Sequence, residues 1–411
     1  MKFGLFYELQ LPKPYGAEQW DEEAEYRVVQ EALQQVELAD QLGFDYVFEV
    51  EHHFLEEYSH SSAPEVFLSA ASQRTTNMRL GHGIVLTPPR YNHPARIAER
   101  IAMLDLVSGG RVEFGSGESA SEMELGGFGV VREEKKSMWE EATREICNMM
   151  VQVPYRGFEG QYFGMPARNV VPKPRQKPHP PLWVAASRKE TTMVAARLGM
   201  GSLGFGFETP QELGERVEEY FRLVHEECFP IGHAINPALA VLSSLSCFED
   251  EQEAIEKGVE GSQFFSYSLG HFYGGGPHEP GDVNLYTRFK DLPPEQRGML
   301  RRRGQLGGNA ANPDEEPEDE VARALWRAAR RGGCIGTPAQ VRETLLQYER
   351  NHLDTMIFVA QSGARKHEDI MKSIELFGTT VMPEFKERHP EHQEWRSRQL
   401  EGVEYPVNSS I

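Results

Sequence analysis

Three titratable side chains stand together where an apolar segment of the chain ends. Residues 44–50 (Phe-Asp-Tyr-Val-Phe-Glu-Val) are mostly aromatic or β-branched, a composition typical of a buried strand. Glu51, His52 and His53 follow directly. An imidazole whose pKa lies near neutrality exchanges protons readily, so these residues are candidates for acid–base chemistry. Successive side chains of a strand point to opposite faces, so a regular strand directs only one of the two histidines into a pocket.

A metal centre is the weaker interpretation of the same segment. Glu56 and Glu57 add carboxylates nearby, but neither a His-Glu-x-x-His nor a His-x-His spacing is present. The four cysteines are dispersed without metal-ligand spacing, which is typical of reduced thiols that pack as small apolar groups. We therefore expect no metal site.

Size and charge exclude several classes of function. The chain has 411 residues and 39% hydrophobic content, and no apolar run reaches the length of a membrane span. Its net charge of −20 disfavours nucleic acid or an anionic membrane surface as a partner. Residues 2–7 read as a strand, with no basic and apolar leader before them, so we expect a cytoplasmic protein.

Strand-like and helix-like segments alternate along the chain. The predicted strands are residues 2–7, 44–50, 78–86, 112–115, 182–186, 202–205, 239–247 and 355–359. The predicted helices cover about 22–42, 64–71, 94–106, 133–150, 190–198, 210–227, 250–261, 338–350 and 367–381. Eight alternations of this kind predict a (β/α)8 TIM barrel. An open doubly wound sheet is the alternative, but no Gly-x-Gly-x-x-Gly turn follows the first strand.

One long segment interrupts this alternation between strands seven and eight. Residues 262–333 contain a glycine triplet, an aromatic patch, a basic cluster and an acidic run. A segment of this length without a clear strand is typical of a lid or binding element, and a solvated surface excursion is the alternative. We expect a single barrel domain over residues 1–385, with 262–333 as its insertion and 386–411 as a polar C-terminal tail.

Two of the loops that follow strands carry signals for a ligand. Ser187 lies where the fifth strand gives way to a helix, and Thr191 follows one turn later. Free N–H groups at a helix start, hydroxyls and nearby cations suit a phosphate, although a plain serine N-cap is the alternative. Glycines inside the third strand, Gly81 and Gly83, suggest a bulge or a flat ligand stacked against the backbone.

A set of motifs in a fixed order resembles the bacterial luciferase-like flavin monooxygenases. The resemblance covers about residues 1–260 and 334–385. The motifs are Glu-His-His-Phe at 51–54, Gly-Ile-Val-Leu at 83–86, His-Pro-Ala-Arg-Ile-Ala-Glu at 93–99, the Leu-Asp to Phe-Gly pattern at 104–115, Pro-Leu-Trp-Val-Ala-Ala-Ser at 181–187, Gly-Thr-Pro at 336–338 and His-Glu-Asp-Ile-Met at 367–371.

The resemblance implies a two-component monooxygenase. Reduced FMN would act as a co-substrate at the carboxyl ends of the strands, supplied by a separate NAD(P)H-dependent flavin reductase. Dioxygen would oxygenate a small organic substrate, and the chain would pair as a homodimer. Two alternatives stay open: an oxidoreductase of the same fold that uses a deazaflavin, and a non-catalytic partner subunit.

The resemblance also implies particular site residues. His52 matches the active-site histidine, and a cis peptide bond is expected near His82 and Gly83. Glu118 stands where relatives often have an arginine, so this loop departs from the family pattern. The residues expected to contact the cofactor are Glu51, His82, Gly83, Glu118, Lys136, Ala186, Ser187, Arg188 and Thr191.

Overall fold

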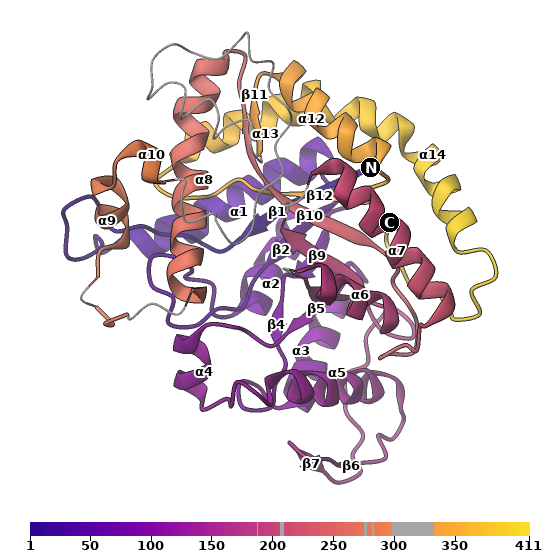
Figure 1. Ribbon diagram of the computed structural model, residues 1–411. Coiled ribbons are helices and arrows are strands. Elements are labelled where there is room, and N and C mark those ends of the chain that lie inside the picture. The colour runs from indigo at the N-terminus through magenta and orange to yellow at the C-terminus, as the bar shows by residue number, and fades with distance from the viewer. Residues whose placement is uncertain (187, 206–208, 275–277, 282, 298–332) are drawn as a thin grey trace.

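Eight parallel strands close into a barrel at the centre of the molecule (Figure 1). The computed structural model describes residues 1–411 except 187, 206–208, 275–277, 282 and 298–332. The barrel strands are β1 (Lys2–Tyr7), β2 (Tyr46–Glu49), β3 (Arg79–His82) with its continuation β4 (Val85–Leu86), β5 (Val112–Gly117), β8 (Leu182–Ala185), β9 (Gly201–Phe205), β10 (Leu239–Cys247) and β12 (Thr355–Val359). Each pairs with its neighbour along the chain, and β12 closes the ring against β1. The predicted (β/α)8 barrel is confirmed.

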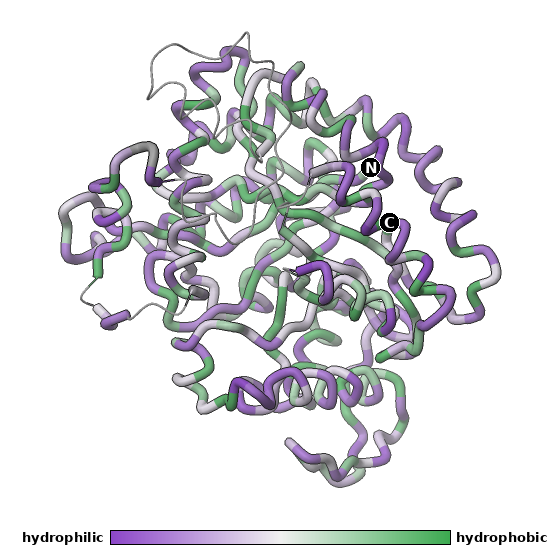
Figure 2. Tube along the Cα trace, viewed as in Figure 1, coloured by the Kyte–Doolittle hydropathy of each residue, from purple (hydrophilic) through white to green (hydrophobic). Residues whose placement is uncertain are grey.

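Helices surround the barrel and turn their apolar faces toward it (Figures 1 and 2). They are α1 (Ala24–Leu42), α2 (Pro64–Arg74), α3 (Pro94–Val107), α4 (Glu122–Phe128), α5 (Lys135–Val151), α6 (Lys189–Arg197), α7 (Pro210–Glu226), α8 (Glu251–Tyr273), α9 (Leu285–Asp291), α10 (Pro294–Arg297), α12 (Pro338–Arg350), α13 (His367–Thr380) and α14 (Met382–Gln399). A hairpin of β6 (Phe158–Glu159) and β7 (Gly164–Met165) projects beyond α5. A further strand, β11 (Gly333–Gly336), pairs with the end of β10.

Large side chains fill the inside of the barrel. Alternate residues of β2 point inward, so Phe48 packs there, with its ring centroid 5.9 Å from that of Trp183. The Trp183 indole N–H donates to Glu113 Oε2 at 2.6 Å, which satisfies its polar atom in this buried layer. A cavity for a ligand therefore has to lie between this layer and the carboxyl ends of the strands.

The glycines of the third strand have a packing role. A Cβ on Gly81 would stand 2.2 Å from Phe48 Cδ1, so this glycine makes room for a core ring and not for a ligand. Gly83 follows β3 and reaches the pocket described below. The cis peptide bonds among the described residues all precede prolines, so the expectation of one near His82 and Gly83 was wrong.

Helix α8 extends further than the sequence suggested. We expected the helix to end at Gly261, but it continues to Tyr273 and carries Phe264, Phe265 and Phe272 toward buried surroundings. A Cβ on Gly261 would approach the carbonyl oxygen of Ser362 to 2.5 Å. Gly261 therefore permits close packing of the helix, and does not end it. The rest of residues 262–333 includes α9, α10 and a segment outside the described residues.

The C-terminal residues form a helix held by a buried ion cluster. Residues 382–399 are helical despite Pro390, where we expected a polar tail from 386 onward. Asp354 Oδ1 accepts hydrogen bonds from Arg396 Nη1 and His392 Nε2, each at 2.7 Å, and its Oδ2 accepts the Leu239 N–H at 2.8 Å. Burial alone would raise the pKa of Asp354, but Arg396 and the hydrogen bonds hold it at about 2.

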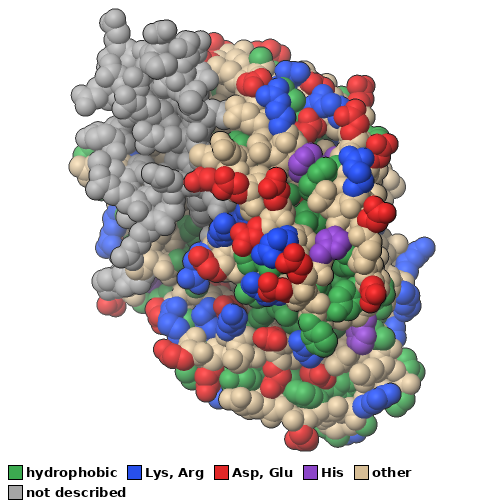
Figure 3. Space-filling view, turned by 45° about the vertical axis from the view of Figure 1, so that its right-hand side comes forward, with side chains coloured by type: hydrophobic (Ala, Val, Ile, Leu, Met, Phe, Trp, Pro, Cys, Tyr) green, Lys and Arg blue, Asp and Glu red, His purple; other side chains and the backbone are tan. Residues whose placement is uncertain are grey.

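The outer surface carries mixed charge. On the face shown in Figure 3, acidic and basic side chains are interspersed and do not separate into patches of one sign. Among the described residues, no helix is both long enough and apolar enough to cross a membrane.

We predict that Asp354→Ala lowers the free energy of unfolding by about 3–5 kcal/mol, because it leaves the buried Arg396 guanidinium without its partner. The contribution of Asp354 should be complete at pH values above its ordinary pKa and be lost as the pH falls toward 2. Urea unfolding measures both effects. Glu391→Ala, on an exposed face of α14, is the control and should change stability by less than about 0.5 kcal/mol. An equal loss in both variants would contradict this account.

Candidate active site

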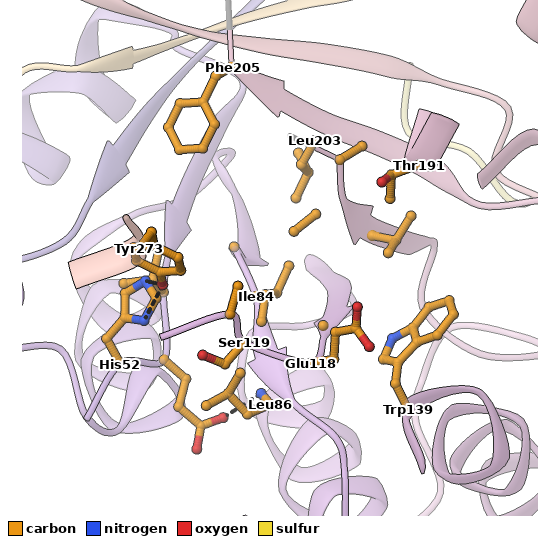
Figure 4. A pocket seen from close by; sticks show the side chains of 18 of the residues that line it. His52, Ile84, Leu86, Glu118, Ser119, Trp139, Thr191, Leu203, Phe205 and Tyr273 are labelled. Carbon is orange, nitrogen blue, oxygen red and sulfur yellow. Dashed lines mark hydrogen bonds between the residues drawn. The ribbon is translucent and has the colours of Figure 1, made fainter. Parts of the chain in front are cut away.

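A pocket of about 550 Å³ opens at the carboxyl ends of the barrel strands. Its walls come from the ends of β1, β2, β4, β5, β8 and β9, and from α5, α6 and α8. This is the end of a (β/α)8 barrel where ligand sites are found. Figure 4 shows His52 and Tyr273 at one end of the pocket, and Thr191, Glu118 and Trp139 at the other.

His52 lies between two buried carboxylates at the first end. Its Nδ1 is 3.0 Å from Glu124 Oε1, and its Nε2 is 3.5 Å from Glu8 Oε2. Tyr273, at the end of α8, places its hydroxyl 3.4 Å from His52 Nδ1. Three separate elements, the end of β1, the end of β2 and helix α4, thus converge on one imidazole.

The carboxylates change the protonation of His52. Burial alone would lower its pKa, but Glu124 and Glu8, together with the hydrogen bond to Glu124, raise it to about 9. The pKa of Glu124 is correspondingly lowered by His52 and its hydrogen bonds, against the effect of burial. His52 is therefore an imidazolium at neutral pH, which differs from the near-neutral group expected from the sequence.

The neighbouring residues of the same motif support this arrangement. His53 Nε2 lies 3.2 Å from Glu51 Oε1, and its backbone N–H donates to Glu124 Oε1 at 2.9 Å. Glu51 Oε2 accepts the Leu86 N–H at 2.7 Å, which ties the loop after β2 to β4. The structure thus places His52 in the wall of the pocket and turns His53 toward Phe128, at a ring distance of 4.9 Å.

The second end of the pocket brings together cations and a hydroxyl. Arg188, Thr191 and Lys136 all line it, and neither Arg188 nor Lys136 forms an ion pair with any described residue. Helix α6 begins here, so the positive end of its backbone dipole lies at the same place. Lys135 is already paired with Glu118, at 2.9 Å. Unpaired cations, a hydroxyl and a helix start suit a phosphate.

Most of the predicted cofactor residues lie in this pocket. Those that line it are Glu51, Gly83, Glu118, Lys136, Ala186, Arg188 and Thr191. His82 does not line it: the side chain is 1% exposed, with Nδ1 3.4 Å from the Glu113 carbonyl oxygen, and burial lowers its pKa to about 4. Ser187 lies outside the described residues.

Glu124, beside His52, and Trp139, in the pocket wall, were not singled out from the sequence, and Tyr273 was expected only as part of the aromatic patch of residues 262–333. Glu124 lies on α4, a short helix that contains two glycines and gives a weak helical pattern. Tyr273 lies at the end of α8, beyond the helix end that we expected. Trp139 is one of several apolar residues of α5, and it donates to Ser116 Oγ at 3.0 Å. Only the tertiary fold brings Tyr273 and Trp139 to the pocket and Glu124 to His52.

The pocket is apolar between its two ends. Its walls there are apolar, formed by Ile84, Leu86, Val184 and Leu203. Ala185 is exposed to the pocket although it belongs to a barrel strand, because its small side chain leaves space above it. An apolar slot that ends in cations and a hydroxyl suits a ligand with a flat apolar ring and a phosphate.

We predict that Glu124→Gln lowers the pKa of His52 from about 9 toward its ordinary value, because the variant keeps the shape of the side chain and removes the charge. A pH titration of the histidine ring signals by NMR measures the change. Glu118→Gln removes a pocket carboxylate that pairs with Lys135 and should leave the pKa of His52 where it is. An unchanged pKa in Glu124→Gln would refute the role of this ion pair.

Known proteins share both sequence and fold with this chain. The model of the luciferase-like monooxygenase family matches residues 1–355. Uncharacterized protein y4wF of Sinorhizobium fredii is 35% identical over 202 residues, covering 49% of this chain and 57% of that protein. The oxygenase component of a flavin-dependent trigonelline monooxygenase from Acinetobacter baylyi is 25% identical over 396 residues, covering 94% and 96%. An F420-dependent glucose-6-phosphate dehydrogenase of Beutenbergia cavernae is 34% identical over 174 residues, covering 40% and 49%.

Solved structures agree on the fold. Monooxygenase RslO1 from Streptomyces bottropensis superposes with a TM-score of 0.70 at 24% identity, covering 94% of this chain and all of that one. The oxygenating constituent of 3,6-diketocamphane monooxygenase from Pseudomonas putida, in complex with FMN, gives 0.67 at 16% identity, covering 93% and 98%. The family model covers most of the chain, so this protein belongs to the luciferase-like monooxygenase family and is an oxidoreductase.

Proposed function

We propose that the chain is the oxygenase component of a two-component monooxygenase that uses reduced FMN and dioxygen to oxygenate a small organic substrate. A separate NAD(P)H-dependent flavin reductase would supply the reduced flavin. The observation that carries this proposal is one pocket with an imidazolium at one end and unpaired cations with a hydroxyl at the other. The full-length similarity to a flavin-dependent oxygenase component supports it.

The proposal assigns roles to particular side chains. His52 is the catalytic residue, since it holds a proton at the edge of the pocket. Arg188, Thr191 and Lys136 would bind the phosphate of FMN, together with Ser187. Gly83, Ala186 and Glu118 would lie against the rest of the cofactor. Glu51 would act indirectly, through its contacts with His53 and with the Leu86 N–H. His82 does not line the pocket and would not contact the cofactor.

The residues of the chain would bind the cofactor, keep water from the reacting atoms and donate a proton. Reduced FMN supplies the electrons with which dioxygen is activated. Apolar walls and the end of α8, with Leu269 and Tyr273, keep water from the reacting atoms. The imidazolium of His52 donates a proton to negative charge that develops on oxygen, and Glu124 stabilises the charged ring until that step.

Further parts of the proposal concern the domain organisation, the cellular location and the oligomeric state. We take residues 1–385 as one barrel domain, with 262–333 as its lid or insertion and 386–411 as its C-terminal tail. The position of Tyr273 beside His52 supports the lid, because α8 leads into this insertion. The cysteines Cys147, Cys228, Cys247 and Cys334 are free, which suits the reducing cytoplasm. The family resemblance supports a homodimer.

A second candidate function is hydride transfer with a deazaflavin coenzyme and without dioxygen. Its support is the local similarity to an F420-dependent glucose-6-phosphate dehydrogenase. Both cofactors present a flat ring system and a phosphate, so the pocket accommodates the chemistry of either.

The two functions predict opposite results in a screen of small organic substrates. With reduced FMN and air, we expect product that contains one oxygen atom from ¹⁸O-labelled dioxygen, detected by mass spectrometry. With reduced deazaflavin under anaerobic conditions, we expect none. Product formed only in the second reaction would overturn the proposal.

His52→Ala should lower turnover with FMN by about 100-fold while FMN still binds.

We predict that Ser187→Ala combined with Thr191→Ala weakens FMN binding by about 1–3 kcal/mol, because hydrogen bonds to the charged phosphate are lost. Fluorescence titration measures the affinity. Riboflavin has the same ring system without the phosphate, so its affinity should not change. An equal loss for FMN and riboflavin would place the phosphate elsewhere.

A further inference from the structure

One carboxylate oxygen of Glu8 has no hydrogen-bond donor among the described residues. The residue follows β1, is 1% exposed and lines the pocket. Its Oε1 accepts the Tyr58 hydroxyl at 2.8 Å. Its Oε2 is buried without a hydrogen-bond donor, and its charged neighbour is His52 Nε2 at 3.5 Å. A buried carboxylate oxygen in this state is costly, so a group of a bound ligand is the natural partner.

The charges at this end of the pocket do not balance. Glu8 and Glu124 are two carboxylates, and His52 is the single cation between them. Glu124 is the more fully bound carboxylate, since it also accepts the His53 N–H and the Ser119 hydroxyl. Among the described residues, no lysine or arginine forms an ion pair with either carboxylate. One negative charge is therefore left over in buried surroundings, where charges are normally paired.

The pocket cations lie elsewhere. Lys136 and Arg188 line the end that carries Thr191, and Figure 4 shows that end across the pocket from His52. Burial raises the pKa of Glu8, so the excess charge attracts a proton as long as no other cation is present.

Aromatic rings surround the same end. Tyr58, Tyr273 and Phe205 line the pocket there, and the ring centroids of Tyr58 and Tyr273 are 6.4 Å apart. The ring centroid of His52 lies 6.1 Å from that of Tyr273. Aromatic faces carry negative charge density and attract cations, while they exclude anions. Rings around a carboxylate oxygen that lacks a hydrogen-bond donor form a site for an organic cation.

We infer that the His52 end of the pocket binds a substrate that carries a positive charge on a flat, apolar body, and that Glu8 is the residue that recognises this charge. The inference deepens the proposed function and rests on it, because it names the substrate class of the same site. The selectivity comes from the Glu8 carboxylate and the surrounding rings, so a neutral molecule of the same shape binds more weakly.

The test compares molecules of one shape and different charge. N-methylpyridinium is positively charged, toluene is its neutral counterpart, and phenol is neutral but donates a hydrogen bond. Calorimetric titration of the full chain, with and without oxidised FMN, should show N-methylpyridinium binding at least about tenfold more tightly than toluene. Glu8→Gln should remove this preference and leave toluene affinity within about twofold.

Glu190→Gln is the matched control. It also removes one negative charge from the pocket lining, but at the start of α6, so the preference for the cation should stay. Equal or weaker binding of the cation in the wild-type protein would overturn the inference, even if Glu8→Gln does not fold. Phenol binding as tightly as the cation would also overturn it, because Glu8 would then recognise a hydrogen bond and not a charge.

The two proposals fail in different ways. If FMN binds and the cation preference is absent, only the substrate class is wrong. If FMN does not bind and the preference is present, the cofactor is wrong and the cation site stands. Thermal unfolding of each variant shows whether a lost preference comes from lost structure.

Discussion

The protonated imidazole of His52, held between two buried carboxylates, is the interaction on which the rest of the site depends. Glu8 comes from the end of β1, His52 from the end of β2 and Glu124 from α4 after β5. Parallel pairing of Tyr7 with Glu49 brings the first two chain segments side by side. Closure of the barrel then brings in the third segment, so that Glu124 Oε1 lies 3.0 Å from His52 Nδ1. A charge placed in this way is stable only because neighbouring charges offset its burial.

The rest of the pocket follows from this constraint. The barrel layer of Phe48 and Trp183 closes the cylinder from below, so a ligand enters only from the carboxyl ends of the strands. The His52 proton and the Glu8 carboxylate lie at one end, and the cations of Arg188 and Lys136 lie at the other. Under the proposed function, a molecule with a flat ring and a phosphate would span both ends in one orientation. That orientation would leave the space beside Glu8 and Tyr273 to the substrate.

The sequence predicted most of the scaffold and several residues that line the candidate site. Apolar, β-branched runs identify the eight barrel strands because each is buried on both faces. The pattern was misleading at Gly261, where a glycine permits close packing within a continuing helix, and at Pro390, inside a helix held by Asp354. Glu124 was missed because a carboxylate on a short, glycine-rich segment looks like surface until the barrel closes. The raised pKa of His52 depends on that carboxylate and was therefore equally hidden.

A crystal structure of the chain with bound FMN tests the central claim most directly. The account predicts the phosphate within hydrogen-bonding distance of Thr191 and Arg188, the ring system along Ile84 and Val184, and its reactive edge toward His52. A phosphate bound away from α6, or a ring whose edge faces away from His52, would contradict it.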